Sequence, residues 1–220
     1  MKIKWFGHAA FLLSGNNVVL IDPFITDNPS APCKWSDINC EIICITHGHQ
    51  DHFGDAIKIA KKNNAVIISN HEIAEYASQS AMVEGLNKGG SIKMKNTKIT
   101  MTNAFHSSSM KETYMGEACG YIIESGAKIY HAGDTCLFSD MRLIGDAGLD
   151  VAILPIGDRY TMGIDDAVSA VALLMPKIVI PMHYDTFPII KQNPKKFKAL
   201  VEAAGKAEVV ILKPGEEFEV

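Results

Sequence analysis

The chain lacks the features that would assign it to a membrane or to a secreted, disulfide-rich protein. No apolar run approaches the roughly 18 residues needed to cross a bilayer. The opening Met-Lys-Ile-Lys-Trp-Phe-Gly-His introduces polar side chains too early for the apolar segment of a signal peptide. The 5 cysteines are an odd number and include no Cys-x-x-Cys pair, which argues against a disulfide framework. We therefore expect a cytoplasmic protein with reduced thiols and no membrane association.

Positive charge is also scarce. The 21 Lys and Arg residues face 25 Asp and Glu residues, so the formal net charge is −4, whereas proteins that bind nucleic-acid phosphates need a basic surface. The densest basic groups, Lys61-Lys62 and Lys195-Lys196, have the pattern of solvated helix faces. We expect a small-molecule substrate rather than a nucleic acid, and assembly into a homo-oligomer is left open.

Short apolar runs separated by turns indicate β-strands in the first part of the chain, at residues 3–6, 10–13, 18–21 and 42–45. Asp22-Pro23 opens an irregular stretch that continues to about residue 39, and a loop of that length inside a domain is usually functional. Helical spacing of apolar residues follows from Gly54, and then a strand at 65–69 and a helix at 72–79 are expected.

The remainder of the chain first returns to a β pattern and then alternates strands with helices. Strands are expected at 91–93, 98–103, 118–124 and 128–131, the last two joined by a tight turn at Ser125-Gly126. The alternating elements of the final third are expected at 151–154, 165–174, 178–181, 194–203 and 208–212. No linker or low-complexity segment interrupts this order. We predict one α/β domain over residues 1–220, with two sheets packed together and helices outside.

Four side chains that can bind metals lie within six residues after the strand at 42–45, namely His47, His49, Asp51 and His52. A single histidine is more often a satisfied polar group than a ligand. Several imidazoles and a carboxylate are costly to bury together, however, unless a divalent cation pairs them. Residues two apart in an extended segment point the same way, so His47 and His49 can bind one ion together. The chain then turns into a helix, which presents Asp51 and His52 toward a second position.

Two further polar residues follow apolar strands in the same way. Asp134 follows the strand at 128–131 through a glycine, and His183 follows the apolar run at 178–182. Taken alone, Asp134 is better explained as a turn residue that caps a helix starting near Leu137. Together with the His-rich run, three separate strands deliver ligand-type side chains at their carboxyl ends.

The run Thr46-His47-Gly48-His49-Gln50-Asp51-His52 resembles the T-H-x-H-x-D-H signature of the metallo-β-lactamase superfamily. The resemblance extends over nearly the whole chain, because the later ligand positions have matches in the expected order, at His106, Asp134 and His183. The strings Trp-Phe-Gly-His-Ala and Tyr-His-Ala-Gly-Asp-Thr are most similar to small metal-dependent hydrolases related to ascorbate-6-phosphate lactonase. This resemblance implies a four-layer α/β fold, the αββα sandwich of two mixed sheets flanked by helices, with metals at one rim.

The resemblance also implies two metal positions and a reaction. The first would be bound by His47, His49, His106 and Asp134, and the second by Asp51, His52, Asp134 and His183. Nitrogen and oxygen donors without cysteine suit zinc, although manganese, iron, nickel or cobalt would also match. A hydroxide bridging the two ions would then cleave an ester, lactone or phosphoester. Two carboxylates would act in catalysis, with Asp134 bridging the ions and Asp51 orienting the nucleophile.

Several polar residues near these positions have roles that the sequence leaves open. Four of them are candidates for orienting a ligand or contacting substrate: His8, His131, Arg159 and Tyr184. Thr186 is comparable to Tyr184. His71 is better explained as a capping or surface residue, and Cys136 occupies no expected ligand position.

Two other functions remain as alternatives to a hydrolase. One is an iron-dependent oxidoreductase on the same scaffold. Flavodiiron proteins resemble H-x-E-x-D-H at the motif, where this chain has His49, but a mononuclear iron dioxygenase is harder to exclude. The other is a metal-binding protein without turnover, against which the complete set of ligand-type residues counts.

Overall fold

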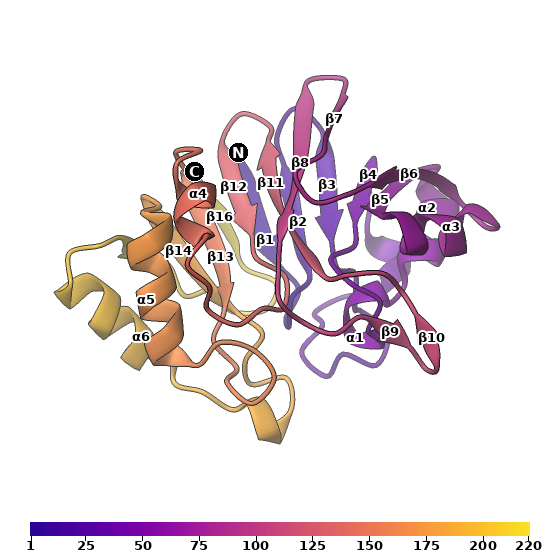
Figure 1. The fold of residues 1–220 in the computed structure, drawn as a ribbon. Coiled ribbons are helices and arrows are strands. Elements are labelled where there is room, and N and C mark those ends of the chain that lie inside the picture. The colour runs from indigo at the N-terminus through magenta and orange to yellow at the C-terminus, as the bar shows by residue number, and fades with distance from the viewer.

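The computed structural model describes residues 1–220 and contains two seven-stranded mixed sheets that pack face to face (Figure 1). The first sheet has the order β16-β1-β2-β3-β4-β5-β6. Its strands pair antiparallel from β16 to β3 and parallel from β3 to β6. The strands are β1 (Lys2–Trp5), β2 (Phe11–Ser14), β3 (Val18–Ile21), β4 (Ile42–Cys44), β5 (Val66–Asn70), β6 (Met82–Leu86) and β16 (Glu217–Glu219).

The second sheet has the order β15-β14-β13-β12-β11-β8-β7. Here β12 to β15 are parallel, and β7, β8 and β11 extend the sheet as an antiparallel meander. Its strands are β7 (Ser91–Met94), β8 (Thr97–Asn103), β11 (Cys119–Glu124), β12 (Lys128–His131), β13 (Val151–Pro155), β14 (Ile178–Met182) and β15 (Glu208–Val209). A separate hairpin, β9 (Ser109–Met110) with β10 (Thr113–Tyr114), lies in the connection from β8 to β11.

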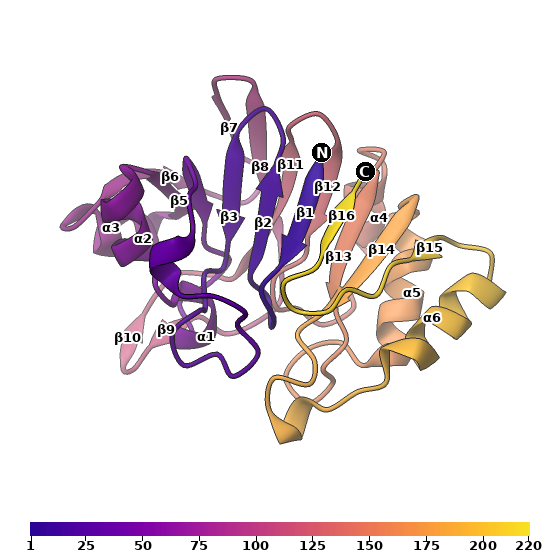
Figure 2. The same ribbon diagram turned by 180° about the vertical axis from the view of Figure 1, so that it is seen from behind.

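Helices cover the outer face of each sheet. The first sheet is covered by α2 (Ala56–Asn63) and α3 (His71–Ser78), and the second by α4 (Met141–Gly145), α5 (Ile164–Leu174) and α6 (Pro194–Ala203) (Figures 1 and 2). The short elements α1 (Gln50–Phe53), η1 (Trp35–Asp37) and η2 (Pro188–Ile190) lie in loops. None of the helices combines the length and apolar character needed to cross a membrane. Because helices cover the outer faces of the two packed sheets, the predicted four-layer αββα sandwich is confirmed.

Alternation along the strands explains why the sheets pack in layers. In β3, Val19 and Ile21 belong to the large core that also contains Tyr121 of the second sheet. Between them, Leu20 belongs to a second core under α2 and α3. Both faces of the strand are therefore apolar, as expected for a strand that is covered on both faces. Each fully buried aliphatic side chain contributes about 1.5–3 kcal/mol, which stabilises this register.

The loops that follow the parallel strands all meet at one edge of the sandwich. The carboxyl ends of β3, β4 and β5 in the first sheet, and of β12, β13 and β14 in the second, point to this edge. The turn from β1 to β2 and the connection from β8 to β11 reach the same edge. We call this edge the functional rim. The sequence segments that carry the candidate ligands thus converge because of strand direction alone.

The structure differs from the sequence prediction at several elements, among them β6, the β9–β10 hairpin, α4 and β15. Strand β6 was not predicted, because its exposed edge position removes the apolar alternation that marks a strand. Helix α4 begins at Met141 rather than near Leu137. The strand expected at 208–212 extends only over Glu208–Val209, the part that pairs with β14.

The carboxylate of Asp150 links the starting ends of three parallel strands. One oxygen accepts a hydrogen bond from the Lys128 backbone N at 2.8 Å, and the other accepts one from Lys177 Nζ at 2.7 Å. These bonds, with that from Lys177 first, lower the pKa of Asp150 below its usual value. We predict that Asp150→Asn lowers the unfolding free energy of the metal-free protein by about 1 kcal/mol at pH 7.

The pH dependence of this difference follows from the lowered pKa. A carboxylate whose pKa is lower in the folded state stabilises the fold above its unfolded-state pKa of about 3.9 and loses this contribution at lower pH. The difference between the two proteins should therefore shrink as the pH falls below about 4, as measured by urea unfolding. A constant difference across this range would contradict the assignment.

Candidate metal centre

The His-rich run forms a turn between β4 and α1 at the functional rim. His49 has extended backbone angles and immediately precedes α1. His47 and His49 therefore lie on the same side of an extended segment, with His47 Nε2 2.9 Å from His49 Nδ1. Helix α1 ends at Phe53 and is followed by Gly54, whose φ is +45°, and a Cβ there would lie 2.3 Å from the Pro23 carbonyl oxygen. Only glycine permits this close return of the chain.

The first group of donors consists of His47, His49 and His106, whose ligand atoms lie within 4.8 Å of one another. The Thr46 hydroxyl donates to Asp22 at 2.6 Å, so it accepts a hydrogen bond from His47 Nδ1 at 3.0 Å. This bond leaves the Nε2 lone pair of His47 free. Burial lowers the pKa values of His47 and His106, which favours the neutral form that binds metals.

The second group consists of His8, Asp51, His52 and His183, whose ligand atoms also lie within 4.8 Å of one another. His52 Nδ1 donates to Asp22 at 2.7 Å, which directs Nε2 into the centre. His8 Nε2 lies 3.0 Å from Asp51 Oδ2. Burial raises the pKa of Asp51, but the hydrogen bond with His8 and the neighbouring histidines lower it overall. Burial, with the charge of His183, lowers the pKa of His8 to about 4.

Asp134 lies between the two groups. Its Oδ2 is 3.0 Å from His183 Nε2, 3.4 Å from His52 Nε2 and 3.6 Å from His106 Nε2. Burial raises the pKa of Asp134, but the charges of His183 and His52 outweigh burial and hold it well below its usual value. Burial likewise lowers the pKa of His52, and Asp134 and Asp22 raise it well above its usual value. The middle of the cluster therefore has a negative potential that favours a cation.

Several buried polar atoms in the cluster make no contact with hydrogen-bond geometry: His52 Nε2, Asp134 Oδ1, and both ring nitrogens of His183. Two of them, the Nε2 atoms of His52 and His183, lie near Asp134 Oδ2. A buried polar group without a partner costs about 1–3 kcal/mol. Concentration of such groups at one point is expected where donors face a bound cation. The nitrogen and oxygen donors match divalent transition metals, zinc among them. All seven residues predicted as ligands are brought together, and the donor set suits a metal.

Asp22 was missed by the sequence analysis. Its two oxygens accept hydrogen bonds from the Thr46 backbone N, the Thr46 hydroxyl and His52 Nδ1, at 2.8, 2.6 and 2.7 Å. Asp22 is fully buried and has a φ of +45°. The sequence does contain a signal for this role, because an aspartate that directly follows a fully apolar strand needs polar partners once that strand is buried.

The candidates for supporting roles lie in different surroundings. His131 is bound only to the backbone, through its Nε2 to the Ala9 carbonyl oxygen and through its Nδ1 to the Gly133 N. Tyr184 is buried against Trp5, with ring centroids 5.5 Å apart. Arg159 is exposed and makes no ion pair. Its loop is held next to Asp134 by a hydrogen bond from the Met162 backbone N to the Thr135 carbonyl oxygen. His71 is exposed at the first position of α3, and Cys136 is exposed as well.

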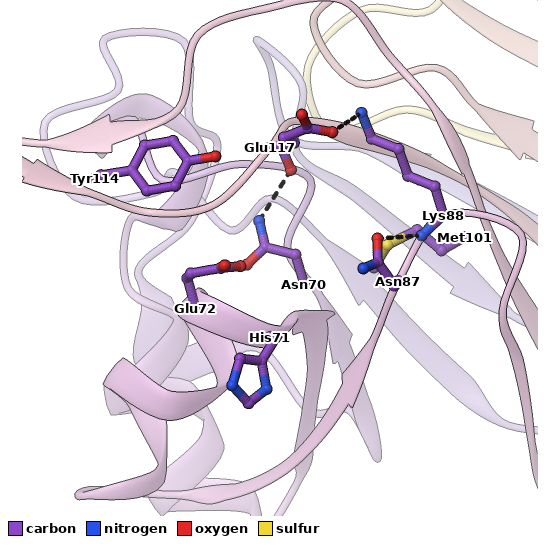
Figure 3. A pocket seen from close by; sticks show the side chains of 8 residues that line it. All are labelled: Asn70, His71, Glu72, Asn87, Lys88, Met101, Tyr114 and Glu117. Carbon is purple, nitrogen blue, oxygen red and sulfur yellow. Dashed lines mark hydrogen bonds and ion pairs between the residues drawn. The ribbon is translucent and has the colours of Figure 1, made fainter.

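Two open cavities lie beside the centre on the functional rim. The groove next to the centre, of about 760 Å³, is lined by Lys88, Asn103, Ala104, Phe105, His106 and Glu117. A second pocket of about 510 Å³, shown in Figure 3, shares Lys88 and Glu117 with that groove but contains no residue of the donor groups. In Figure 3, Lys88 points toward Glu117, with which it pairs at 2.7 Å. We call the first cavity the His106 groove, since it reaches a candidate ligand.

Comparison with known proteins gives consistent matches. The family model described as "Beta-lactamase superfamily domain" matches residues 2–183. A UPF0173 metal-dependent hydrolase of Methanosarcina barkeri is 48% identical over 227 residues, covering 100% of this chain and 99% of the relative. A protein of the same description from Thermococcus kodakarensis is 48% identical over 226 residues, and the match covers 100% of both chains. The structure of Igni18, described as a novel metallo hydrolase from Ignicoccus hospitalis, has a TM-score of 0.92 and 40% identity, covering 100% of this chain and 98% of its own.

His106 and His131 provide a test of the donor assignment. His106 faces Asp134, whereas both ring nitrogens of His131 are occupied by backbone groups. We predict that His106→Ala lowers Zn²⁺ affinity by more than the roughly 10–100-fold typical of residues that only support a ligand. His131→Ala should cost no more than that range, and should mainly lower thermal stability. Competition with a chromophoric chelator measures both affinities, and the reverse order would show that the wrong histidine was chosen.

Proposed function

The chain belongs to the beta-lactamase superfamily, and from this membership and the geometry of the centre we propose that it is a hydrolase dependent on two divalent metal ions. The proposed substrate is a small cytoplasmic molecule with an ester, lactone or phosphoester bond. The observation that carries the proposal is the position of Asp134 Oδ2 between donor nitrogens of both groups. The finer likeness to ascorbate-6-phosphate lactonase stays a prediction.

Six residues of the two donor groups, together with Asp134, would hold the ions. His47, His49 and His106 would bind the first ion, Asp51, His52 and His183 the second, and Asp134 both. When bound, two such ions lower the pKa of a shared water from about 15.7 to about 7 and polarise the oxygen under attack. The identity of the ions is proposed to be zinc, with manganese, iron, nickel or cobalt as the other candidates.

The chain's own residues position these donors before substrate arrives. Thr46 and Asp22 fix the rings of His47 and His52, and the Ser107 hydroxyl lies 3.3 Å from His49 Nε2. Rings fixed in this way need little reorganisation during the reaction. Asp51 is the most exposed carboxylate of the centre, with 35% of its side chain exposed. In its ionised form it can accept a hydrogen bond from the attacking water at Oδ1 and hold it in line.

No side chain is placed to act as a covalent nucleophile. The Ser107 hydroxyl lies against His49, and the Ser108 hydroxyl accepts from the Gly48 N and donates to the Met115 carbonyl oxygen. The Ser108 hydroxyl has no imidazole or carboxylate beside it. His49 is not a base for Ser107, because with its Nδ1 lone pair assigned to the metal its Nε2 carries the proton and donates to the Ser107 hydroxyl. Cys136 is absent from both donor groups. We therefore propose direct attack by water. The His106 groove gives room for the rest of the substrate. We propose that the exposed side chain of Arg159 contacts an anionic part of it.

Metal content tests the two-ion proposal. The protein reconstituted with Zn²⁺ and freed of excess metal should contain about two ions per chain by elemental analysis, because two donor groups share Asp134. Asp51→Ala and His52→Ala should each reduce this content toward one, because they remove donors from the second group alone. A content of one in the unchanged protein that neither substitution alters would contradict the second ion.

Activity tests the chemistry independently of the natural substrate. With any ester or lactone that is turned over, the rate should rise with pH through an apparent pKa near 7 and then level off. A chelator should abolish turnover, and zinc or manganese should restore it. Asp134→Ala should lose most activity, since it disturbs both groups, whereas Cys136→Ala should stay within about twofold of the unchanged protein.

Isotope and redox controls separate hydrolysis from the alternatives. In labelled water the product should carry one labelled oxygen, because the attacking oxygen comes from solvent. A trapped acyl- or phosphoryl-enzyme would contradict direct attack. Oxygen-dependent turnover of the iron-loaded protein, with no ester cleavage under any metal, would instead support the oxidoreductase.

A further inference from the structure

His8 lies inside the second donor group although it is remote in sequence from the His-rich run. It is in the turn between β1 and β2 and is only 1% exposed. Its carbonyl oxygen accepts hydrogen bonds from the His183 N and from Trp5 Nε1, both at 3.0 Å. The backbone of His8 is thus held directly beside the segment that follows β14. The ring of His8 lies 3.9 Å from that of His183 between centroids.

The hydrogen bonds of His8 follow the pattern of three of the five histidines proposed as ligands. His47, His49 and His52 each have one ring nitrogen held by a side-chain oxygen, while the other nitrogen faces the centre. His183 differs, because neither of its ring nitrogens has a hydrogen-bond partner. His8 shares the pattern of the first three, with Nδ1 3.0 Å from the Thr186 hydroxyl and Nε2 facing Asp51. A metal-bound histidine is usually held in this way through its other nitrogen. His131 lacks the pattern, because both its nitrogens contact backbone groups.

The spacing of the donors also suits a shared ion. The ligand atoms of His8, Asp51, His52 and His183 lie within 4.8 Å of one another. Zinc–nitrogen and zinc–oxygen bonds are about 2.0–2.2 Å long, so two ligands of one tetrahedral ion are separated by about 3.4 Å. The widest pairs of the group would therefore have to approach one another by about 1 Å, which side-chain rotations can supply. His8 Nε2 is already 3.0 Å from Asp51 Oδ2, a normal separation for neighbouring ligands.

We propose that His8 is a direct ligand of the second metal ion. This inference rests on the proposed two-metal centre. It gives each ion three imidazole donors, namely His47, His49 and His106 for the first and His8, His52 and His183 for the second, with Asp134 shared. A nitrogen-rich second position favours zinc, nickel, cobalt or iron over magnesium or calcium, which prefer oxygen ligands. The competing role for His8 is to orient Asp51 through a hydrogen bond without binding the ion.

A spectroscopic count of nitrogen ligands separates these roles in the unchanged full-length protein. The probe is ¹¹³Cd²⁺ bound to protein labelled with ¹⁵N-histidine, in which each bound ring nitrogen splits the cadmium signal. We expect two cadmium signals, each split by three nitrogens. Splitting of one signal by three nitrogens and of the other by two would overturn the proposal, because His8 would then not bind the ion.

Variants provide a second, independent readout. In His8→Gln, which retains a hydrogen-bond donor toward Asp51, one splitting of the second cadmium signal should disappear. The Cd²⁺ affinity of that position should fall by more than the roughly 10–100-fold typical of supporting residues. Thr186→Val should keep all six splittings and stay within that range. His71→Ala, which removes an exposed histidine on α3, is the matched control and should leave both affinities unchanged.

The outcomes also separate the two proposals. If His8→Gln keeps both the splittings and the affinities of the unchanged protein, His8 only orients Asp51 and the ligand assignment is wrong. A chain that binds a single Cd²⁺ would contradict the two-metal centre instead. The presence or absence of the His8 coupling on that one ion would still decide whether His8 is a ligand.

Discussion

The carboxylate of Asp22 is the interaction on which the arrangement of the centre depends. It follows β3 directly and accepts hydrogen bonds from Thr46, after β4, and from His52, in α1. The carboxyl ends of β3 and β4 and the helix α1 are thereby fixed relative to one another by one buried group. The Thr46 hydroxyl then sets the ring of His47. Removal of this charge would leave a buried imidazole and a backbone N–H without partners, each of which is costly.

The layered fold could be predicted from the sequence because its signals are local and repeated. The continuous apolar run in β3 and the 3.6-residue spacing of Ala167, Ala170, Val171 and Leu174 in α5 define faces that are buried in the fold. Strand β6 gave no such signal, since it lies at an edge and packs only part of one face. Short elements such as α4 depend on tertiary contacts rather than on their own pattern.

The candidate site was predictable where ligand types cluster along the chain, as at His47 to His52, or match a known order, as at His106, Asp134 and His183. Asp22 and the position of His8 were less accessible, because each acts through a partner that is distant in sequence. His8 meets Asp51 and Thr186 only after the β1–β2 turn and the end of β14 reach the same rim. Such pairings follow from topology, which no local pattern encodes.

The two sheets contribute donors to the centre in nearly equal share. His47, His49, Asp51 and His52 follow β4 of the first sheet, whereas His106, Asp134 and His183 follow β8, β12 and β14 of the second. A cation held at this junction would cross-link the layers, so its binding free energy would add to the free energy of folding. By mass action the gain is about 2.7 kcal/mol when the free ion is at 100 times its dissociation constant. The thermal stability of the protein would then depend partly on the concentration of free metal around it. In a cell that lacks this metal, the same sequence would form a protein with a lower unfolding temperature.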